Sequence, residues 1–180
     1  PYAISKYEAE VGLRELAADT GMEVIIIRPP LIYGPGVKGN FLSLMKLAGT
    51  GLPLPFGSID NRRSMIFLGN MVHFIITCLH HPEVGNQTFL ISDGEDLSVT
   101  QLLKKIASAM GRPSRLIPIP SSLLKMALSI VGKASIADRL CGSLQVDITK
   151  ARTLLGWSPV ISMDEGFKQT AHFFQQNATQ

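Results

Sequence analysis

The run "MEVIIIRPP" at residues 22–30 decides the fold. It is short, continuously apolar and rich in β-branched side chains, and Pro29 and Pro30 close it. This pattern predicts a buried strand, and a parallel one, because strands covered on both faces carry apolar residues without alternation. A helical pattern occupies residues 3–19 before it, and Gly21 is placed to end that helix. Helix, tight turn and buried strand together predict half of a βαβ unit.

The rest of the chain alternates short extended runs with helical patterns. Asn40 and Ser98 stand where they can cap helices, and Gly111 stands where the second of these helices would end. We predict strands or extended pieces at 52–57, 64–68, 87–94 and 115–120, and helices at 40–47, 70–79, 99–111, 121–132, 149–157 and 164–174. The alternation predicts an α/β protein, but the strands are too few for a complete doubly wound sheet.

Composition narrows the class of protein. The chain has 180 residues, 46% of them hydrophobic, and a formal charge of +3. Its 17 Lys and Arg residues are scattered, so we expect a small anionic ligand and no nucleic acid. No run reaches the roughly 20 apolar residues of a membrane span, so membrane insertion is not expected. Cys78 and Cys141 lie far apart, and the four His residues have no ligand spacing, so we expect no disulfide and no metal site. A reducing cytoplasm fits this usage of cysteine.

Tyr2 and Lys6 form the first candidate for chemistry. Four residues separate them, so both side chains lie on one face of the predicted helix, one turn apart. An ammonium near a phenol favours the phenolate form, which makes the Tyr a usable acid or base. Two ordinary surface residues of a helix can have the same spacing, so the pair alone does not decide between these interpretations.

The order of the motifs favours the catalytic interpretation. "YAISK" at 2–6 is followed by "VIIIRP" at 24–29, "YGPG" at 33–36 and "NRRSMIFLGNMV" at 61–72. "GNF", "PFG", "QTFLISDGEDLSVTQLLKKI" and "VDITKARTLLGWSP" extend the series. The chain thereby resembles, over nearly its whole length, the extended short-chain dehydrogenase/reductase family, in its NAD-dependent nucleotide-sugar epimerase and dehydratase branch.

The resemblance implies the C-terminal part of an NAD(P)-binding Rossmann fold plus a smaller α/β substrate-binding lobe. Residues 1–36 would supply the last helix and strand of the Rossmann domain. Residues 37–180 would form the nucleotide-sugar lobe, with 66–95 returning to the Rossmann sheet. No GxGxxG or GxxGxxG motif occurs in the chain, although such a motif marks the first strand-to-helix turn of a dinucleotide-binding fold. We therefore expect the chain to be the C-terminal part of a longer enzyme, and to be inactive by itself.

The resemblance also implies a catalytic and cofactor-binding set. Tyr2 would exchange a proton with the sugar oxygen at C4. Lys6 would bind the nicotinamide ribose and hold Tyr2 near phenolate. Pro29 would follow the strand whose backbone lies beside the nicotinamide, although ending that strand explains a proline equally well. The implied cofactor is NAD, with NADP possible.

Four residues are implied to bind substrate: Asn40, Phe56, Arg63 and Arg139. Asn40 and both arginines would contact the diphosphate, and Phe56 would pack near the uracil ring. Three alternatives stay open: Asn40 as a plain helix cap, Phe56 as a core residue, and Arg62 in place of Arg63.

Three residues depart from the pattern of UDP-sugar epimerases in this branch. Leu31 stands where an Asn is usual, and Ser64 and Asn70 each stand where an Asp is usual. These departures leave the sugar open. The leading interpretation is a UDP-sugar 4-epimerase, as a homodimer. The alternatives are an NAD(P)H-dependent reductase of a UDP-4-keto-6-deoxy-N-acetylhexosamine and a non-catalytic nucleotide-sugar-binding module.

Overall fold

The predicted helix-turn-strand unit is present. The computed structural model describes residues 2–130, 132 and 134–177. Helix α1 runs from Tyr2 to Thr20, and Gly21 follows with a left-handed φ of 72° that other residues adopt only with strain. Strand β1 (Ile26–Arg28) then pairs in parallel with β4 (Thr88–Leu90), in a register that sets Ile26 beside Thr88. The predicted parallel strand is thus confirmed, but only Ile26 in it is buried.

A second, three-stranded sheet follows directly. Strand β2 (Leu31–Tyr33) pairs in parallel with β3 (Arg63–Phe67), which pairs in antiparallel fashion with β5 (Asp96–Leu97). The sequence did not predict β2 or β5. The prolines at 29 and 30 explain the break between β1 and β2, because neither carries an N–H to continue the first ladder.

One hydrophobic core lies between the three-stranded sheet and three helices. These are α2 (Gly39–Gly49), α4 (Val99–Ala109) and α8 (Met163–Asn177). Ser98 caps α4 as predicted: its Oγ accepts from the Gln101 N–H at 3.1 Å, and the Gln101 side chain accepts from the Ser98 N–H. The centre of this core is a cluster of stacked or tilted rings, formed by Tyr33, Phe41, Phe67 and Phe167.

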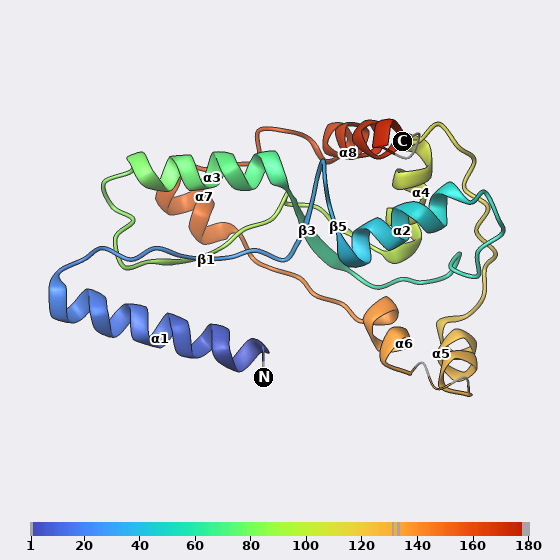
Figure 1. Ribbon diagram of the computed structural model, residues 1–180, viewed down its shortest axis with the longest axis horizontal. Helices are drawn as coiled ribbons and strands as arrows, with labels where there is room; N and C mark the ends of the chain where they lie inside the picture. The colour runs from blue at the N-terminus through green and yellow to red at the C-terminus, as the bar shows by residue number, and fades with distance from the viewer. Residues whose placement is uncertain (1, 131, 133, 178–180) are drawn as a thin grey trace.

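A second core lies on the β1–β4 pair. Helices α3 (Leu68–His80) and α7 (Thr149–Leu155) cover one face of β1, and α1 lies on the other side (Figure 1). Phe74 meets Phe89 and Trp157 edge to face, with ring centroids 5.5 and 5.0 Å apart. Helices on both faces of parallel strands confirm the α/β class.

Helices α5 (Ser121–Ile130) and α6 (Ala134–Cys141) pack on each other beside the first core. The helix predicted over 121–132 is confirmed to Ile130, and residue 131 lies outside the described residues. Helix α6 was not predicted. Among the helices of the described residues, none combines the length and the apolar composition needed to cross a membrane.

Candidate functional site

The orientation of α1 is set by two contacts to the first sheet. Arg28 Nε, at the end of β1, donates to Glu10 Oε1 at 2.9 Å. Arg14 donates to the Thr88 hydroxyl at 2.8 Å, and Thr88 is paired with the first residue of β1. Helix α1 therefore runs antiparallel to β1, and its first turns extend past the carboxyl end of that strand. The hydrogen bond from Arg28 holds the pKa of Glu10 below its ordinary value.

Tyr2 and Lys6 lie on this projecting end. Lys6 Nζ is 5.7 Å from the centroid of the Tyr2 ring, so the shared face predicted from their spacing is confirmed. Tyr2 is 77% exposed. Pro29 directly follows β1, so it stands at the same carboxyl edge. In parallel α/β sheets ligands bind beyond this edge. The arrangement offers a phenol and an ammonium to a ligand placed there.

Arg63 and Arg139 are brought together although 76 positions separate them. Arg63 is the first residue of β3, and its Nη1 donates to the backbone carbonyl of Arg139 at 2.6 Å. Arg139 is exposed in the last turn of α6. The side chain of Arg62 is exposed and the structure shows no such contact for it within the described residues. Of the two neighbouring arginines, Arg63 is therefore the one joined to α6.

A buried polar framework supports this arginine pair. Asn61 donates to the carbonyls of Leu140 and Gly142 at 3.1 and 2.8 Å, and accepts from the Val99 N–H at 2.9 Å. Ser64, the second residue of β3, makes a similar set of bonds. Its hydroxyl donates to Asp96 at 2.6 Å and accepts from the Val146 N–H at 2.9 Å. Sequence reasoning missed this role, and the polar run "DNRRS" at 60–64 was the available signal. Ser64, which stands where an Asp is usual, thus places a hydroxyl where it joins β3, β5 and the segment at Val146.

Asn40 and Phe56 lie apart from these groups. The cap prediction for Asn40 is wrong: α2 begins at Gly39, Lys38 is the N-cap residue, and Asn40 is the exposed second residue of the helix. Gly39 has a left-handed φ of 66°, which a glycine adopts without strain where the chain turns into the helix. Phe56 is half-buried against the first core, and its carbonyl accepts from the Thr100 hydroxyl at 2.6 Å. Within the described residues no hydrogen bond or ring contact joins either residue to Arg63.

Another polar cluster is buried beneath the loops that follow β2 and β4. The Tyr33 hydroxyl donates to Asp93 Oδ2 at 2.8 Å, and Asn70 Nδ2 donates to Asp93 Oδ1 at 2.7 Å. The Phe67 N–H also donates to this carboxyl. Burial raises the pKa of Asp93, and burial together with Asp93 raises that of Tyr33, so the phenol stays a neutral donor. This cluster is structural, since Tyr33 and Asn70 are fully buried.

Asn70 joins this cluster to the segment that precedes α8. Its Oδ1 accepts from the N–H groups of Val160 and Ile161. An Asn can donate to Asp93 and accept from the backbone at once, which an ionised Asp cannot do. In the part of the chain that the structure describes, no three His, Cys, Asp or Glu residues are grouped to hold a metal ion.

Comparison with known families assigns the chain. The model of the NAD dependent epimerase/dehydratase family matches residues 1–92, which is more than half of the 180 residues. The chain belongs to this family. The match includes the Tyr2–Lys6 pair and both parallel strand pairs of the epimerase/dehydratase chain.

Curated relatives agree with this assignment. A "UDP-glucose 4-epimerase" of Vibrio cholerae is 49% identical over 176 residues, which cover 97% of this chain and 54% of the relative. An Escherichia coli O157:H7 protein named "N-acetyl-alpha-D-glucosaminyl-diphospho-ditrans,octacis-undecaprenol 4-epimerase" is 28% identical over 186 residues, which cover 96% of this chain and 56% of the relative. The epimerase/dehydratase chain therefore spans about half the length of these relatives.

Solved structures share the fold. The UDP-glucose 4-epimerase of Thermotoga maritima, solved with UDP-glucose, matches with a TM-score of 0.73 at 24% identity, over 99% of this chain and 54% of the other. A Bordetella bronchiseptica enzyme in complex with NAD+ and UDP matches with a TM-score of 0.74 at 21% identity, again over 99% and 54%. At these identities the match establishes the α/β fold of the epimerase/dehydratase chain.

Proposed function

We propose that this chain is the C-terminal portion of an NAD-dependent UDP-sugar 4-epimerase. The observation that carries the proposal is the exposed Tyr2–Lys6 pair past the carboxyl end of β1. It occurs in a chain that is 49% identical to a UDP-glucose 4-epimerase. The relatives are about twice as long as this chain, so the activity proposed belongs to the full-length enzyme.

The residues present fit one end of a nicotinamide cofactor. Tyr2 and Lys6 offer a hydroxyl and an ammonium to a ribose, and Pro29 directly follows β1 at the carboxyl edge of the sheet. The chain has no glycine fingerprint to bind the pyrophosphate, so we do not expect tight NAD binding by these 180 residues alone. When bound, NAD would supply the site that accepts and returns hydride at sugar C4.

The side chains would manage protons and orientation. Tyr2 would take the proton of the C4 hydroxyl and return it when the sugar is reduced on its opposite face. Lys6 would bind the nicotinamide ribose with its ammonium, on the same face of α1 as Tyr2. Arg63 and Arg139 would grip the diphosphate, because a guanidinium fork pairs with two phosphate oxygens. Asn40 at the start of α2 and Phe56 would complete the nucleotide contacts.

The organisation of the full-length enzyme is part of the proposal. Residues 1–36 would complete the nucleotide-binding domain and 37–180 would form the substrate lobe, with 66–95 returning to the sheet. The pairing of β4 with β1 supports that return. We also propose a cytoplasmic homodimer, supported by the exposed apolar side chains of Ile4 and Val11 on α1. Analytical ultracentrifugation of the full-length enzyme tests the dimer, and a monomer would contradict it.

The need for added reductant distinguishes an epimerase from its alternatives. We expect the full-length enzyme to purify with NAD bound and to interconvert a UDP-sugar and its C4 epimer without added reductant. An NMR assay with UDP-glucose and UDP-N-acetylglucosamine measures this interconversion. Stoichiometric consumption of NAD(P)H with a 4-keto sugar would instead assign a reductase. Binding of UDP with neither epimerisation nor reduction would instead indicate a non-catalytic binding module.

Replacing Arg63 with Lys is expected to weaken UDP binding to the full-length enzyme by about 10- to 100-fold. The estimate corresponds to losing a charge-assisted hydrogen bond of about 1.5–3 kcal/mol. Arg62→Lys, at the exposed neighbouring position, is the matched control and should leave the affinity unchanged. Calorimetric titration with UDP measures both. If only Arg62→Lys weakens binding, the diphosphate contact belongs to Arg62.

A further inference from the structure

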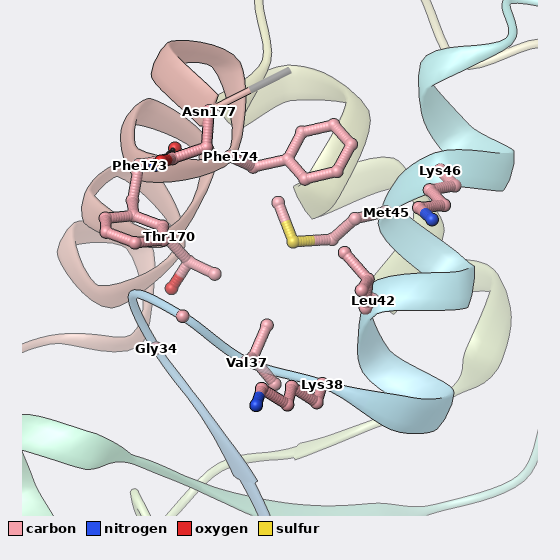
Figure 2. A pocket seen from close by; sticks show the side chains of 11 residues that line it. Gly34, Val37, Lys38, Leu42, Met45, Lys46, Thr170, Phe173, Phe174 and Asn177 are labelled. Atoms are coloured by element: carbon pink, nitrogen blue, oxygen red, sulfur yellow. Dashed lines mark hydrogen bonds between the residues drawn. The ribbon is translucent and has the colours of Figure 1, made fainter. Parts of the chain in front are cut away.

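A pocket of about 560 Å³ lies between α2, α8 and the loop that follows β2. Figure 2 shows Val37, Leu42 and Met45 on one side of it, facing Phe173 and Phe174 of α8 across the gap. Its volume is in the range of small-molecule sites, which are mostly apolar with a few placed polar groups. None of the residues proposed to bind NAD or UDP-sugar lines this pocket.

The charges of the pocket are all of one sign. Lys38 precedes α2 and Lys46 lies in its last turn, and both line the pocket on the α2 side (Figure 2). The lining includes no Asp or Glu. The two ion pairs found among residues 2–130, 132 and 134–177 involve other side chains, so neither lysine has an acidic partner there. The cations are therefore available to a ligand.

A second hollow on the same domain shows that this pattern is not general. It lies between α4 and α8 and also contains lysines, but Lys105 in it is paired with Asp164. Its charges are thus already partly neutralised within the chain. The α2–α8 pocket differs because its two lysines have no carboxylate partner among the described residues, and they stand beside an apolar wall that includes the 40% exposed ring of Phe173.

We propose that the α2–α8 pocket binds a small amphipathic anion, an apolar chain with one anionic head group. The apolar chain lies against Val37, Met45 and the α8 rings, where it removes apolar surface from water. The head group pairs with Lys46 in the last turn of α2, and Lys38, at the other end of the helix, adds a longer-range attraction. Charge complementarity selects this ligand over a neutral or cationic one of the same length, and none of the residues proposed to bind the UDP-sugar lines the pocket.

Titration calorimetry with dodecanoate, below its micelle concentration, tests the proposal. We expect saturable binding of one dodecanoate per chain. Dodecyltrimethylammonium, which has the same tail and the opposite charge, should bind roughly tenfold more weakly or not at all. Dodecyl phosphate has the same tail with a phosphate in place of the carboxylate. Binding of either anion supports the proposal. The proposal is overturned if the cation binds with the same affinity as dodecanoate, or if neither anion binds.

Matched variants locate the site. Lys46→Gln should weaken dodecanoate binding about two- to fivefold, and the double variant Lys38→Gln/Lys46→Gln roughly tenfold. Phe173→Asp, at an exposed position, should abolish binding by placing a carboxylate against the apolar wall. Lys104→Gln in the other hollow removes the same charge and should bind like the parent protein. If Lys104→Gln has the larger effect, the ligand lies elsewhere and the proposal fails.

Discussion

The variant Tyr2→Phe of the full-length enzyme should lose about 10²- to 10⁴-fold in kcat, the contribution typical of a positioned general acid or base. Phe keeps the ring but removes the only group of Tyr2 that can exchange a proton with the C4 oxygen. Because the diphosphate contacts that we propose involve Arg63 and Arg139 and not Tyr2, we expect UDP affinity to stay within about twofold. Steady-state kinetics with UDP-glucose and calorimetry with UDP measure the two quantities.

Tyr7→Phe is the matched control for this prediction. Tyr7 lies on the same helix and is 65% exposed, so the change removes an equivalent hydroxyl from a neighbouring turn. Its kcat should be that of the parent enzyme. Lys6→Met should lower kcat, because it removes the ammonium that is proposed to bind the nicotinamide ribose beside Tyr2. Full activity of Tyr2→Phe would show that Tyr2 is not the acid–base group.

The helices other than α6, and the strands β1, β3 and β4, could be predicted because their signals are local. Ser98, Gly21 and Gly111 stand at helix ends where capping or a left-handed φ is needed, and each does so in the structure. Strands β2 and β5 have two or three residues each, and their existence depends on pairing with β3, a partner remote in sequence. Helix α6 was missed for a related reason, since it has only eight residues and depends on packing against α5.

The candidate site divides in the same way. The Tyr2–Lys6 pair follows from helical spacing, which is a local property. The contact between Arg63 and Arg139 depends on how α6 packs against the start of β3, and no spacing rule could predict it. Asn40 was assigned as a cap because its side chain suits that position, but the helix begins one residue earlier, at Gly39, with Lys38 as its N-cap residue.

The largest change in stability is expected for Asp93→Ala, which should lower the free energy of unfolding by about 2–4 kcal/mol. The substitution leaves the Tyr33 hydroxyl and the Phe67 N–H without the acceptor they share, and unpaired buried donors cost about 1–3 kcal/mol each. Asp93→Asn should cost less, because the amide oxygen still accepts and its NH₂ can donate to the Tyr33 oxygen. Urea unfolding measures both, and a loss below about 1 kcal/mol for Asp93→Ala would contradict the prediction.

The pH dependence of the same variants tests the cause of the pKa shift. Burial raises the pKa of Asp93 in the folded state, so the folded protein binds its proton more tightly than the unfolded chain does. The stability from protonated Asp93 is therefore fully present below the pKa of the unfolded chain, and it is lost as pH rises through the folded pKa. The amide that Asp93→Asn introduces does not titrate. The free energy of unfolding of the parent protein, minus that of Asp93→Asn, should consequently fall as pH rises from about 3 to 7. A difference that rises over this range would show that hydrogen bonds from Asn70 and Phe67 outweigh burial at this carboxyl.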